Sequence, residues 1–378
     1  MINQTLGLWE QVLDSEAKEL NRLYSEGSQG DSPLTFIDLF AGIGGFHLAM
    51  HSVGAQCVFA SEWDKYARQT YEANYRRLAP ELFSRGLFAG DITKVDPASI
   101  PPFDILCAGF PCQPFSYAGL GQGFEDRTRG TLFFDICRII AYHRPKAIFL
   151  ENVKGLVSHR QGKTLQVILD SLNNLGYDAH WKVLSSLDFG LPQKRERWYC
   201  VAFDKKVKYE FPKFVEGNPI LRDIVDIDNN DSKLRLTQFE LDRIQYHFQH
   251  CEEQRRVQHD NTKYAPNTKK GKYGVFSYQK PDGSLRFHVG DVAKTQIQEA
   301  FYACLDTYSP TIIAGRTPKL WDLQRKLSVL EAKRLQGFPD SFIIPVSDHQ
   351  AYKQLGNSVS LPVIKAIAET ILHTLKEQ

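Results

Sequence analysis

A cysteine between two prolines is the feature of this sequence best suited to chemistry. Cys112 lies in the segment GFPCQPFS (109–116), directly after an apolar run at 103–108 that is typical of a buried strand. Open α/β sheets bind ligands in the loops that follow the carboxyl ends of their strands. Prolines on both sides of the Cys112–Gln113 pair restrict the backbone, which suits a nucleophile that must be aimed before its substrate arrives. A free cysteine is more often a small buried residue, so the interpretation depends on its neighbours.

A glycine-rich turn upstream predicts a nucleotide-like ligand. The apolar strand at 36–40 leads into the turn AGIGG (41–45) and then into an apolar helix expected to begin near His47. Close-spaced glycines let the backbone approach a ligand, and Glu62 follows about 20 residues later, where a Rossmann-type unit places its ribose-binding acid. The turn alone does not distinguish a nicotinamide cofactor from S-adenosylmethionine, and it could be no more than a tight turn.

Two further side chains could contact an adenine. Trp63 is adjacent to the acid and could stack on the base, and Asp91 follows a third strand-like segment, where it could accept a hydrogen bond from the exocyclic amine. Each has a simpler alternative. Trp63 could be a surface aromatic, and Asp91 could cap a helix or a turn.

Several short motifs occur in a fixed order along the chain. They are DLFAGIGGF (38–46), EWD (62–64), GDI (90–92), GFPCQ (109–113), ENV (151–153), QKRER (193–197), RLQGFP (334–339) and QLGNSV (354–359). This series resembles the cytosine-C5 DNA methyltransferases over roughly 34–204 and 325–375. The segment between is unaligned, as the variable recognition region of that family would be. The Asp/Asn-Pro-Pro-aromatic tetrapeptide of amino-methylating DNA enzymes is absent.

The resemblance implies methyl transfer from S-adenosylmethionine to C5 of a cytosine. Cys112 would attack C6 as a thiolate, because C5 becomes nucleophilic only after such an attack. Glu151 would hydrogen-bond the N3 and N4 edge, and burial that raises its pKa would help it to be protonated while it donates to N3. Arg195 and Arg197 alternate on a strand-like stretch and would hold the cytosine O2 and orient the loop or phosphates. Without the other motifs, the simpler interpretation of Glu151 would be a carboxylate that caps the turn after its strand. The two arginines would then simply lie on a solvated strand face.

The family pattern also implies the cofactor site. It assigns contacts with S-adenosylmethionine to Phe40, Gly42, Gly44, Glu62, Trp63, Asp91, Ile92, Pro111, Asn357 and Val359. The final helix, roughly 362–375, is expected to return to the large domain and bring the last two of these to the pocket. We predict no metal, since the seven cysteines include no Cys-x-x-Cys pair.

DNA contacts are expected in two places. The target cytosine must leave the duplex, so the glycine-rich loop 113–131 would close over it. Residues 255–294 carry nine Lys/Arg against three acidic residues, interleaved with aromatics, which indicates a basic DNA-facing surface. Arg316 could read a guanine or bind a phosphate, so the recognition sequence stays unassigned. The candidate DNA-binding residues are Gln113, Ser116, Arg129, Lys269, Lys270, Lys272 and Arg316.

The predicted fold class is α/β, a Rossmann-like S-adenosylmethionine-dependent methyltransferase fold with a second, smaller DNA-recognition domain. Strands and helices alternate to about residue 204, typical of a parallel sheet covered on both faces. The turn Pro281-Asp282-Gly283 between strand-like stretches predicts a hairpin. We expect an accessory helix and linker at 1–32, a catalytic and cofactor-binding domain at 33–204 plus 349–378, and a target-recognition domain at 205–348.

Composition agrees with a globular protein of two domains. The chain has 378 residues, 42% of them hydrophobic, and a net charge of +2 that is too small to indicate nucleic acid. No run of 18 apolar residues and no basic leader occur, so we expect neither a membrane span nor a signal peptide. An odd number of cysteines fits a reducing cytoplasm.

The full prediction is a cytoplasmic, monomeric DNA (cytosine-5-)-methyltransferase that acts on double-stranded DNA as the modification enzyme of a bacterial restriction-modification system. Whether a cognate restriction endonuclease accompanies it is left open. One alternative is a tRNA cytosine-C5 methyltransferase, whose motif usually reads Pro-Pro-Cys-Gln and whose insertion is shorter. The other is an inactive DNA-binding homologue, which would be expected to lack Cys112, Glu151 or a cofactor residue.

Overall fold

The computed structural model describes most of the chain from residue 33 to residue 377. The described residues are 33–111, 132–215, 217–238, 241, 256–260, 273–279, 285–291, 297–300, 302–303, 305–306, 308–315, 317–320 and 322–377. The predicted accessory helix and linker at 1–32 lie outside them.

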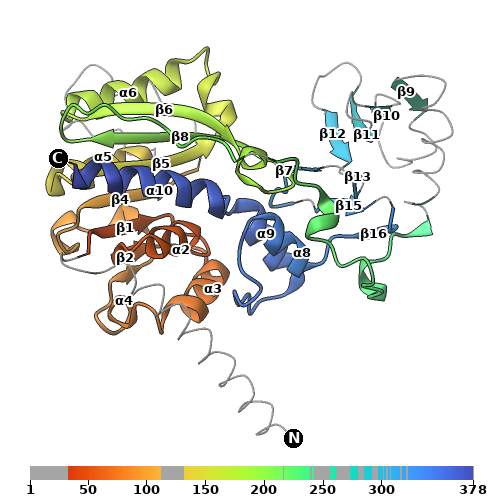
Figure 1. The fold of residues 1–378 in the computed structure, drawn as a ribbon, viewed down its shortest axis with the longest axis horizontal. Helices are drawn as coiled ribbons and strands as arrows, with labels where there is room; N and C mark the ends of the chain where they lie inside the picture. The colour runs from red at the N-terminus through yellow and green to blue at the C-terminus, as the bar shows by residue number, and fades with distance from the viewer. Residues whose placement is uncertain are drawn as a thin grey trace, which may run out of the picture.

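A seven-stranded sheet forms the centre of the large lobe (Figure 1). In spatial order its strands are β3 (Phe88–Ala89), β2 (Gln56–Ser61), β1 (Thr35–Leu39), β4 (Ile105–Gly109), β5 (Ala147–Val153), β8 (Glu196–Phe203) and β6 (Asp178–Ser185). The central strands are short apolar runs buried on both faces, as expected for a sheet that is covered by helices on each side. The predicted α/β class and the strands before the glycine-rich turn and before Cys112 are confirmed.

One strand departs from the parallel pattern of the sheet. Strand β8 runs antiparallel to both of its neighbours, β5 and β6. A parallel pair needs a long crossover, usually a helix, whereas only residues 186–195 separate β6 from β8. That short connection forces the chain to reverse, and it contains β7 (Gln193–Lys194).

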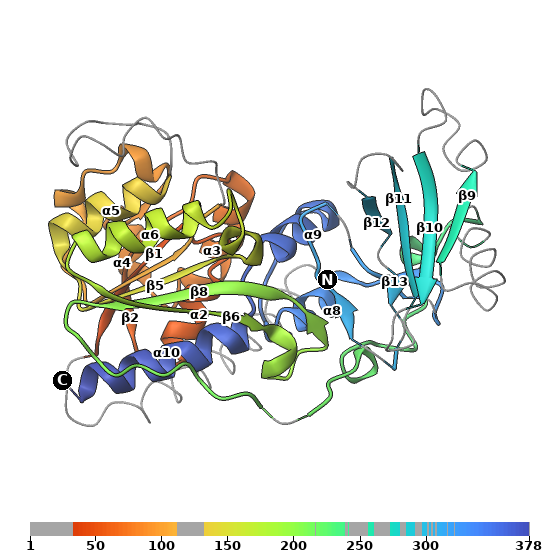
Figure 2. The ribbon, with the colours of Figure 1, turned by 90° about the horizontal axis from the view of Figure 1, so that it is seen from above.

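Helices cover both faces of the sheet, as Figure 2 shows. On one face α2 (Gly45–Ser52), α3 (Lys65–Tyr75) and α10 (Leu361–Lys376) share a hydrophobic core with the sheet. On the other face α5 (Leu132–His143) and α6 (Lys163–Asn174) build a second core. The shorter helices are α4 (Pro80–Ser84), η1 (Ile92–Lys94), η2 (Pro97–Ser99), η4 (Lys154–Val157), η5 (Ser186–Phe189), η6 (Leu221–Asp223) and η7 (Ser232–Leu234).

A four-stranded antiparallel sheet lies in the second lobe, away from the large sheet in Figures 1 and 2. Its strands, in spatial order, are β12 (Ile297–Ala300), β11 (Leu285–Asp291), β10 (Tyr273–Gln279) and β9 (Arg256–Asp260). Gln279 pairs with Leu285 at the end of the β10–β11 ladder, which confirms the hairpin predicted around Pro281-Asp282-Gly283.

Small strand pairs connect the two lobes. Strand β14 (Ser309–Pro310) pairs in parallel with β7, and β13 (Tyr302–Ala303), β15 (Lys319–Leu320) and β16 (Arg325–Lys326) form a three-stranded sheet. The chain from 308 to 315 is therefore attached directly to the connection between β6 and β8.

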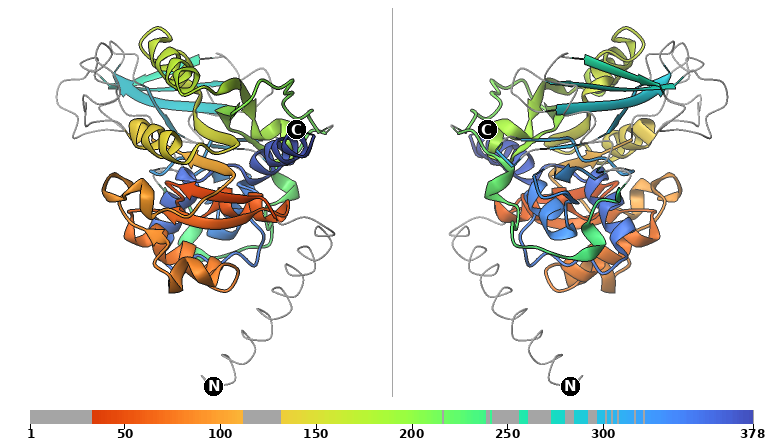
Figure 3. Two further views of the ribbon diagram at one scale, coloured as in Figure 1. Left: turned by 90° about the vertical axis from the view of Figure 1, so that its left-hand side faces the viewer. Right: turned by 90° about the vertical axis from the view of Figure 1, so that its right-hand side faces the viewer.

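The C-terminal part returns to the large lobe through α8 (Val329–Leu335), α9 (Asp348–Asn357) and α10. In Figure 3 the blue C-terminal helix lies with the elements of the large lobe. The predicted final helix is confirmed, and the return begins before residue 349, since Phe342 lies 6.4 Å from Tyr75 of α3, between ring centroids. Asp348–Lys376 is long and apolar enough for a membrane span, but it comprises two helices and its apolar part is mostly buried, which favours a core element.

Candidate active site

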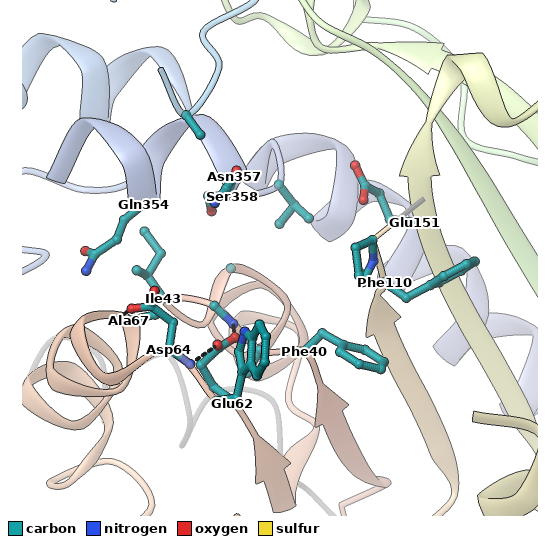
Figure 4. A pocket seen from close by; sticks show the side chains of 18 of the residues that line it. Phe40, Ile43, Glu62, Asp64, Ala67, Phe110, Glu151, Gln354, Asn357 and Ser358 are labelled. Carbon is teal, nitrogen blue, oxygen red and sulfur yellow. Dashed lines mark hydrogen bonds between the residues drawn. The ribbon is translucent and has the colours of Figure 1, made fainter. Parts of the chain in front are cut away.

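A cavity of about 1090 Å³ opens where β1, β2, β4 and β5 end (Figure 4). Its lining comes from the loops after these strands, from residues 313–315 and from the end of α9. The predicted residues Phe40, Gly42, Glu62, Trp63, Asp91, Ile92, Pro111, Glu151, Arg195, Arg197, Asn357 and Val359 all line it. The cavity therefore brings together motifs separated by more than 300 positions, at the edge of the sheet where the fold class places its ligands.

Glu62 is fixed by backbone hydrogen bonds on one wall of the cavity. The Gly42 N–H donates to Oε2 at 2.8 Å, and the Asp64 N–H donates to Oε1 at 2.7 Å. Burial raises the pKa of Glu62, and these two hydrogen bonds partly oppose that rise. Because a carboxylate oxygen has two lone pairs, each oxygen can accept one more hydrogen bond from a ligand.

The glycine-rich turn between β1 and α2 adopts left-handed backbone at Phe40, Gly42 and Gly44. Gly44 does not line the cavity, although the family pattern predicts a cofactor contact there. A Cβ atom at this position would lie 2.2 Å from Cε2 of Tyr75, whose hydroxyl donates to the Gly44 carbonyl at 2.5 Å. Gly44 therefore has a packing role, in which it lets the turn rest on α3 and so shapes the wall that holds Glu62.

An ion pair that the sequence did not predict closes the same wall. Asp64 accepts from the N–H groups of Tyr66 and Ala67 and so caps the start of α3. Its other oxygen lies 3.1 Å from Nζ of Lys353 in α9. The contact joins residues 289 positions apart, and both line the cavity. It attaches the C-terminal return to the motif that carries Glu62.

Asp91 and Trp63 lie at the open side of this wall. Oδ1 of Asp91 accepts from the N–H and the hydroxyl of Thr93 at 3.0 and 2.8 Å, and these bonds lower its pKa. The capping role weighed for Asp91 is thus present, and the adenine contact remains a prediction. Trp63 is 81% exposed and lines the cavity, so its ring is accessible for stacking.

The chain that leads into Cys112 is held by Asn152. The Asn152 amide donates to the Phe110 carbonyl at 2.8 Å, and the Phe110 ring packs 5.7 Å from that of Phe133, between centroids. Pro111 follows on the cavity wall. The sequence contained Asn152 only as part of a motif, with no role assigned to it. Cys112, Gln113, Ser116 and Arg129 lie outside the described residues.

Glu151 occupies the wall opposite Glu62 (Figure 4). It is 8% exposed, at the end of β5, and its Oε1 lies 3.3 Å from Nε of Arg197 on the adjacent strand β8. Burial raises the pKa of Glu151, while the charges of Arg197 and Arg195 act against the rise. The direction of this shift is the one that the predicted donation to N3 needs, and that role stays a prediction.

Backbone carbonyls surround the guanidinium of Arg195. Its Nη1 donates to the carbonyls of Ile312 and Gly356 at 2.9 and 3.2 Å, and Nη2 donates to those of Gly356 and Ser358. Both terminal nitrogens are thus bonded to backbone carbonyls, and the contact with the cytosine O2 stays a prediction. Alternation along the strand correctly placed both arginines at the cavity but could not reveal which acceptors each would reach.

Four other cysteines are poor candidates for a nucleophile. Cys57, Cys107, Cys137 and Cys200 are free and buried. Burial raises the pKa of each thiol, to about 12 for Cys137. A buried thiol of high pKa is chemically inert. In the described part of the chain, no group of His, Cys, Asp or Glu residues could hold a metal ion.

The end of α9 brings Asn357 and Val359 to the cavity, as predicted. Val359 packs so closely on the start of α2 that a Cβ at Gly45 would lie 2.5 Å from its Cγ2. The predicted DNA-binding residues Lys269, Lys270, Lys272 and Arg316 lie outside the described residues.

Comparison with known proteins identifies the family. The family model for the C-5 cytosine-specific DNA methylases matches residues 34–373. The chain belongs to this family. The type II methyltransferase M.HhaI of Haemophilus parahaemolyticus is 40% identical over 344 residues, which cover 89% of this chain and 94% of the relative. M.NlaX of Neisseria lactamica is 43% identical over 339 residues, covering 88% and 94%.

Solved structures agree on the fold. The crystal structure of S. pombe Dnmt2 covers 91% of this chain, and 99% of its own, with a TM-score of 0.62 and 20% identity. The protein is a DNA (cytosine-5-)-methyltransferase with a Rossmann-like fold, and its substrate is DNA. Relatives named as type II methyltransferases place it with DNA methylation in restriction-modification systems and favour the DNA enzyme over the tRNA alternative.

Proposed function

We propose that this methyltransferase uses S-adenosylmethionine to methylate C5 of a cytosine flipped out of duplex DNA, through a covalent bond between Cys112 and C6. The observation that best supports the proposal is the Glu151–Arg197 pair. The two side chains meet at 3.3 Å and line the same cavity as Pro111, the residue before Cys112. An acid and a cation at this point match the edge of a cytosine that accumulates negative charge.

The residues on the opposite wall fit the proposed cofactor. Both oxygens of Glu62 retain lone pairs for ribose hydroxyls, and the exposed ring of Trp63 is accessible to an adenine. Bound there, S-adenosylmethionine would supply a methyl group carried on a positively charged sulfur. The residues that would hold it are Phe40, Gly42, Glu62, Trp63, Asp91, Ile92, Pro111, Asn357 and Val359.

Cys112 and Glu151 carry out different parts of the proposed reaction. The Cys112 thiolate adds to C6, and the electron pair moves through the ring toward N3, which makes C5 nucleophilic. Glu151, whose pKa burial raises, donates to N3 in its protonated form and so stabilises that charge. Once C5 carries the methyl group, its proton passes to a base, and the C6–sulfur bond breaks to restore the ring and the thiolate.

Trapping with 5-fluorocytosine tests this proposal. Fluorine cannot leave C5 as a proton does, so the wild-type enzyme should remain bonded to a duplex with 5-fluorocytosine at the target and migrate with it on a denaturing gel. Cys112→Ala should form no such complex and show no methyl transfer. Cys137→Ala, at a buried thiol of α5, should still be trapped. Near-normal turnover in Cys112→Ala, or no complex with the wild type, would refute the covalent mechanism.

We further propose that base reading resides between about residues 205 and 325. Arg316→Ala should relax the methylated sequence at one position, at a cost of roughly 1 to 3 kcal/mol of discrimination. Neutralising Lys269, Lys270 and Lys272 together should weaken DNA binding and its salt dependence without changing the site, because lysines in a basic loop are expected to contact phosphates. Bisulfite sequencing of a methylated random library distinguishes the two effects.

A further inference from the structure

Three segments of the chain meet at the buried guanidinium of Arg195. Its four hydrogen bonds reach the carbonyl of Ile312 in one segment and those of Gly356 and Ser358 in another. Arg195 itself belongs to the connection between β6 and β8, and only 2% of it is exposed. A charge buried to this extent is stable only where polar groups surround it, and here backbone carbonyls from two distant segments supply them.

We call residues 308–315 the recognition segment and residues 356–359 the cofactor turn. The recognition segment precedes Arg316, and three of its residues, Ile313, Ala314 and Gly315, line the cavity together with the whole of the cofactor turn. The recognition segment lies within the region proposed to read bases, and the cofactor turn carries Asn357 and Val359, which are predicted to contact the cofactor.

Gln193 holds the recognition segment from the same connection. Its Oε1 accepts from the Ile312 N–H at 2.9 Å, while its Nε2 donates to the Leu335 carbonyl at 2.9 Å. The pairing of Ser309 with Gln193 in the β14–β7 ladder adds a backbone attachment. Ile312 is therefore bonded on both sides, through its N–H to Gln193 and through its carbonyl to Arg195.

Gly356 brings the two segments into direct backbone contact. A Cβ atom there would lie 2.3 Å from the carbonyl carbon of Ile313 and 2.4 Å from the nitrogen of Ala314. Backbone atoms cannot move aside as a flexible side chain can, so no other residue fits without separating the segments. The cofactor turn and the recognition segment consequently cannot shift independently.

We infer that Arg195 is a positioning residue that ties the recognition segment to the cofactor turn, so that DNA bound at the first strengthens cofactor binding at the second. The inference rests on the proposed function, since it takes S-adenosylmethionine and duplex DNA as the two ligands. Coupling between two sites requires an element that both ligands bias, and the Arg195 contacts supply one. By linkage, the cofactor strengthens DNA binding by the same factor.

Calorimetry with S-adenosylhomocysteine, in the absence and presence of a saturating duplex that contains the methylated site, tests this role. The wild type should bind the cofactor product more tightly with DNA, by a factor in the range of roughly 5 to 150. Arg195→Lys keeps the charge, but the single nitrogen of an ammonium group cannot reproduce the four hydrogen bonds that the guanidinium makes from two nitrogens, so the factor should fall toward 1. If the substitution only disturbed packing, each ligand would bind more weakly, but the ratio of cofactor affinities with and without DNA would stay as in the wild type.

Gly356→Ala should reduce the coupling in the same way, because its methyl group separates the segments. Gly155→Ala is the matched control, since a Cβ at this exposed glycine meets no atom within 4 Å, and it should keep the wild-type factor. Wild-type coupling in Arg195→Lys, or a factor of 1 in the wild type, would overturn the inference. Failure of the wild type to bind S-adenosylhomocysteine or duplex at all would instead refute the proposed function.

Hydrogen exchange on the wild type provides a test that needs no variant. Adding S-adenosylhomocysteine without DNA should slow exchange of the amides in residues 309–315, because the ligand stabilises the turn to which they are tied. Unchanged exchange there, at a cofactor concentration shown to saturate the enzyme, would contradict the coupling.

Discussion

Glu62 and Glu151 lie at strand ends on opposite walls of one cavity, and both have a pKa raised by burial. Their surroundings differ. Glu62 accepts two backbone N–H groups, at 2.8 and 2.7 Å, and among the described residues its carboxylate forms no ion pair. The carboxylate of Glu151 instead has Arg197 at 3.3 Å, and no backbone N–H of the described residues donates to it.

The comparison shows that the two acids differ less in burial than in the groups that contact their carboxylates. Backbone donors belong to a rigid turn and hold Glu62 in one place as an acceptor, which suits hydroxyl groups of a ligand. An arginine side chain beside Glu151 stabilises a carboxylate, while burial favours the neutral acid, so its proton can be exchanged as charge on the base changes. We therefore propose that Glu62 binds the cofactor and that Glu151 carries the proton chemistry.

The largest effect is expected at Glu151. Glu151→Gln keeps the shape but has no exchangeable acid, so methyl transfer at saturating cofactor should fall by roughly 10² to 10⁴-fold, the usual range for general acid catalysis. Single-turnover assays with labelled cofactor would measure the fall. A loss below about threefold would show that Glu151 takes no part in the chemistry. The proposed difference between the two walls would then be wrong.

Stability should reveal how rigid the Glu62 wall is. Gly44→Ala combines a left-handed backbone with a clash against Tyr75, so it should lower the free energy of unfolding by about 2 to 5 kcal/mol. Gly54→Ala, at a left-handed glycine with open space around it, should cost only the conformational part, about 1 to 2 kcal/mol. Urea denaturation would measure both. Equal losses would show that the Tyr75 contact does not brace the turn.

The smallest effect is a pH dependence of stability. Burial raises the pKa of Glu151 above 4.5, so in this group the folded state binds the proton more tightly than the unfolded state. Its contribution is fully present below pH 4.5 and is lost as the pH rises through the raised pKa. The stability of the wild type relative to Glu151→Gln should therefore decrease as the pH rises.

Glu331 is a control of opposite sign. It is also buried, but hydrogen bonds from Arg325 and Ser328 outweigh burial and lower its pKa. Its contribution is present above pH 4.5 and is lost as the pH falls through the lowered pKa, so the wild type should gain stability relative to Glu331→Gln as the pH rises. Difference curves of the same slope for the two variants would contradict the assigned shifts.

Much of the Glu62 wall could be predicted because it is local. Strand, turn, helix and acid follow each other within about 30 residues, and backbone geometry alone forces the turn toward the acid. Gly44 shows the limit of this reasoning, since the spacing located the glycine but not Tyr75, the residue that makes it necessary. The Asp64–Lys353 pair joins two motifs 289 positions apart, and no local pattern could indicate it.

The wall that carries Glu151 was harder to predict, because it depends on contacts between residues far apart in the sequence. The direction of β8 followed from a connection too short for a crossover, which was visible only once β6 was recognised as its partner. Side-chain period correctly placed Arg195 and Arg197 at the cavity. The acceptors that hold Arg195 come from residues 312, 356 and 358, which only the tertiary structure brings together.

The division of the cavity into two walls can be tested by titrating S-adenosylhomocysteine into Glu62→Gln and Glu151→Gln side by side, without DNA. Glu62→Gln replaces one acceptor oxygen by an N–H₂ group that would oppose the backbone donors, so cofactor affinity should fall by about 1.5 to 3 kcal/mol, the scale of a charged hydrogen bond. Glu151→Gln should bind within about twofold of wild type. Weak binding in Glu151→Gln together with wild-type affinity in Glu62→Gln would contradict the assignment of the two walls.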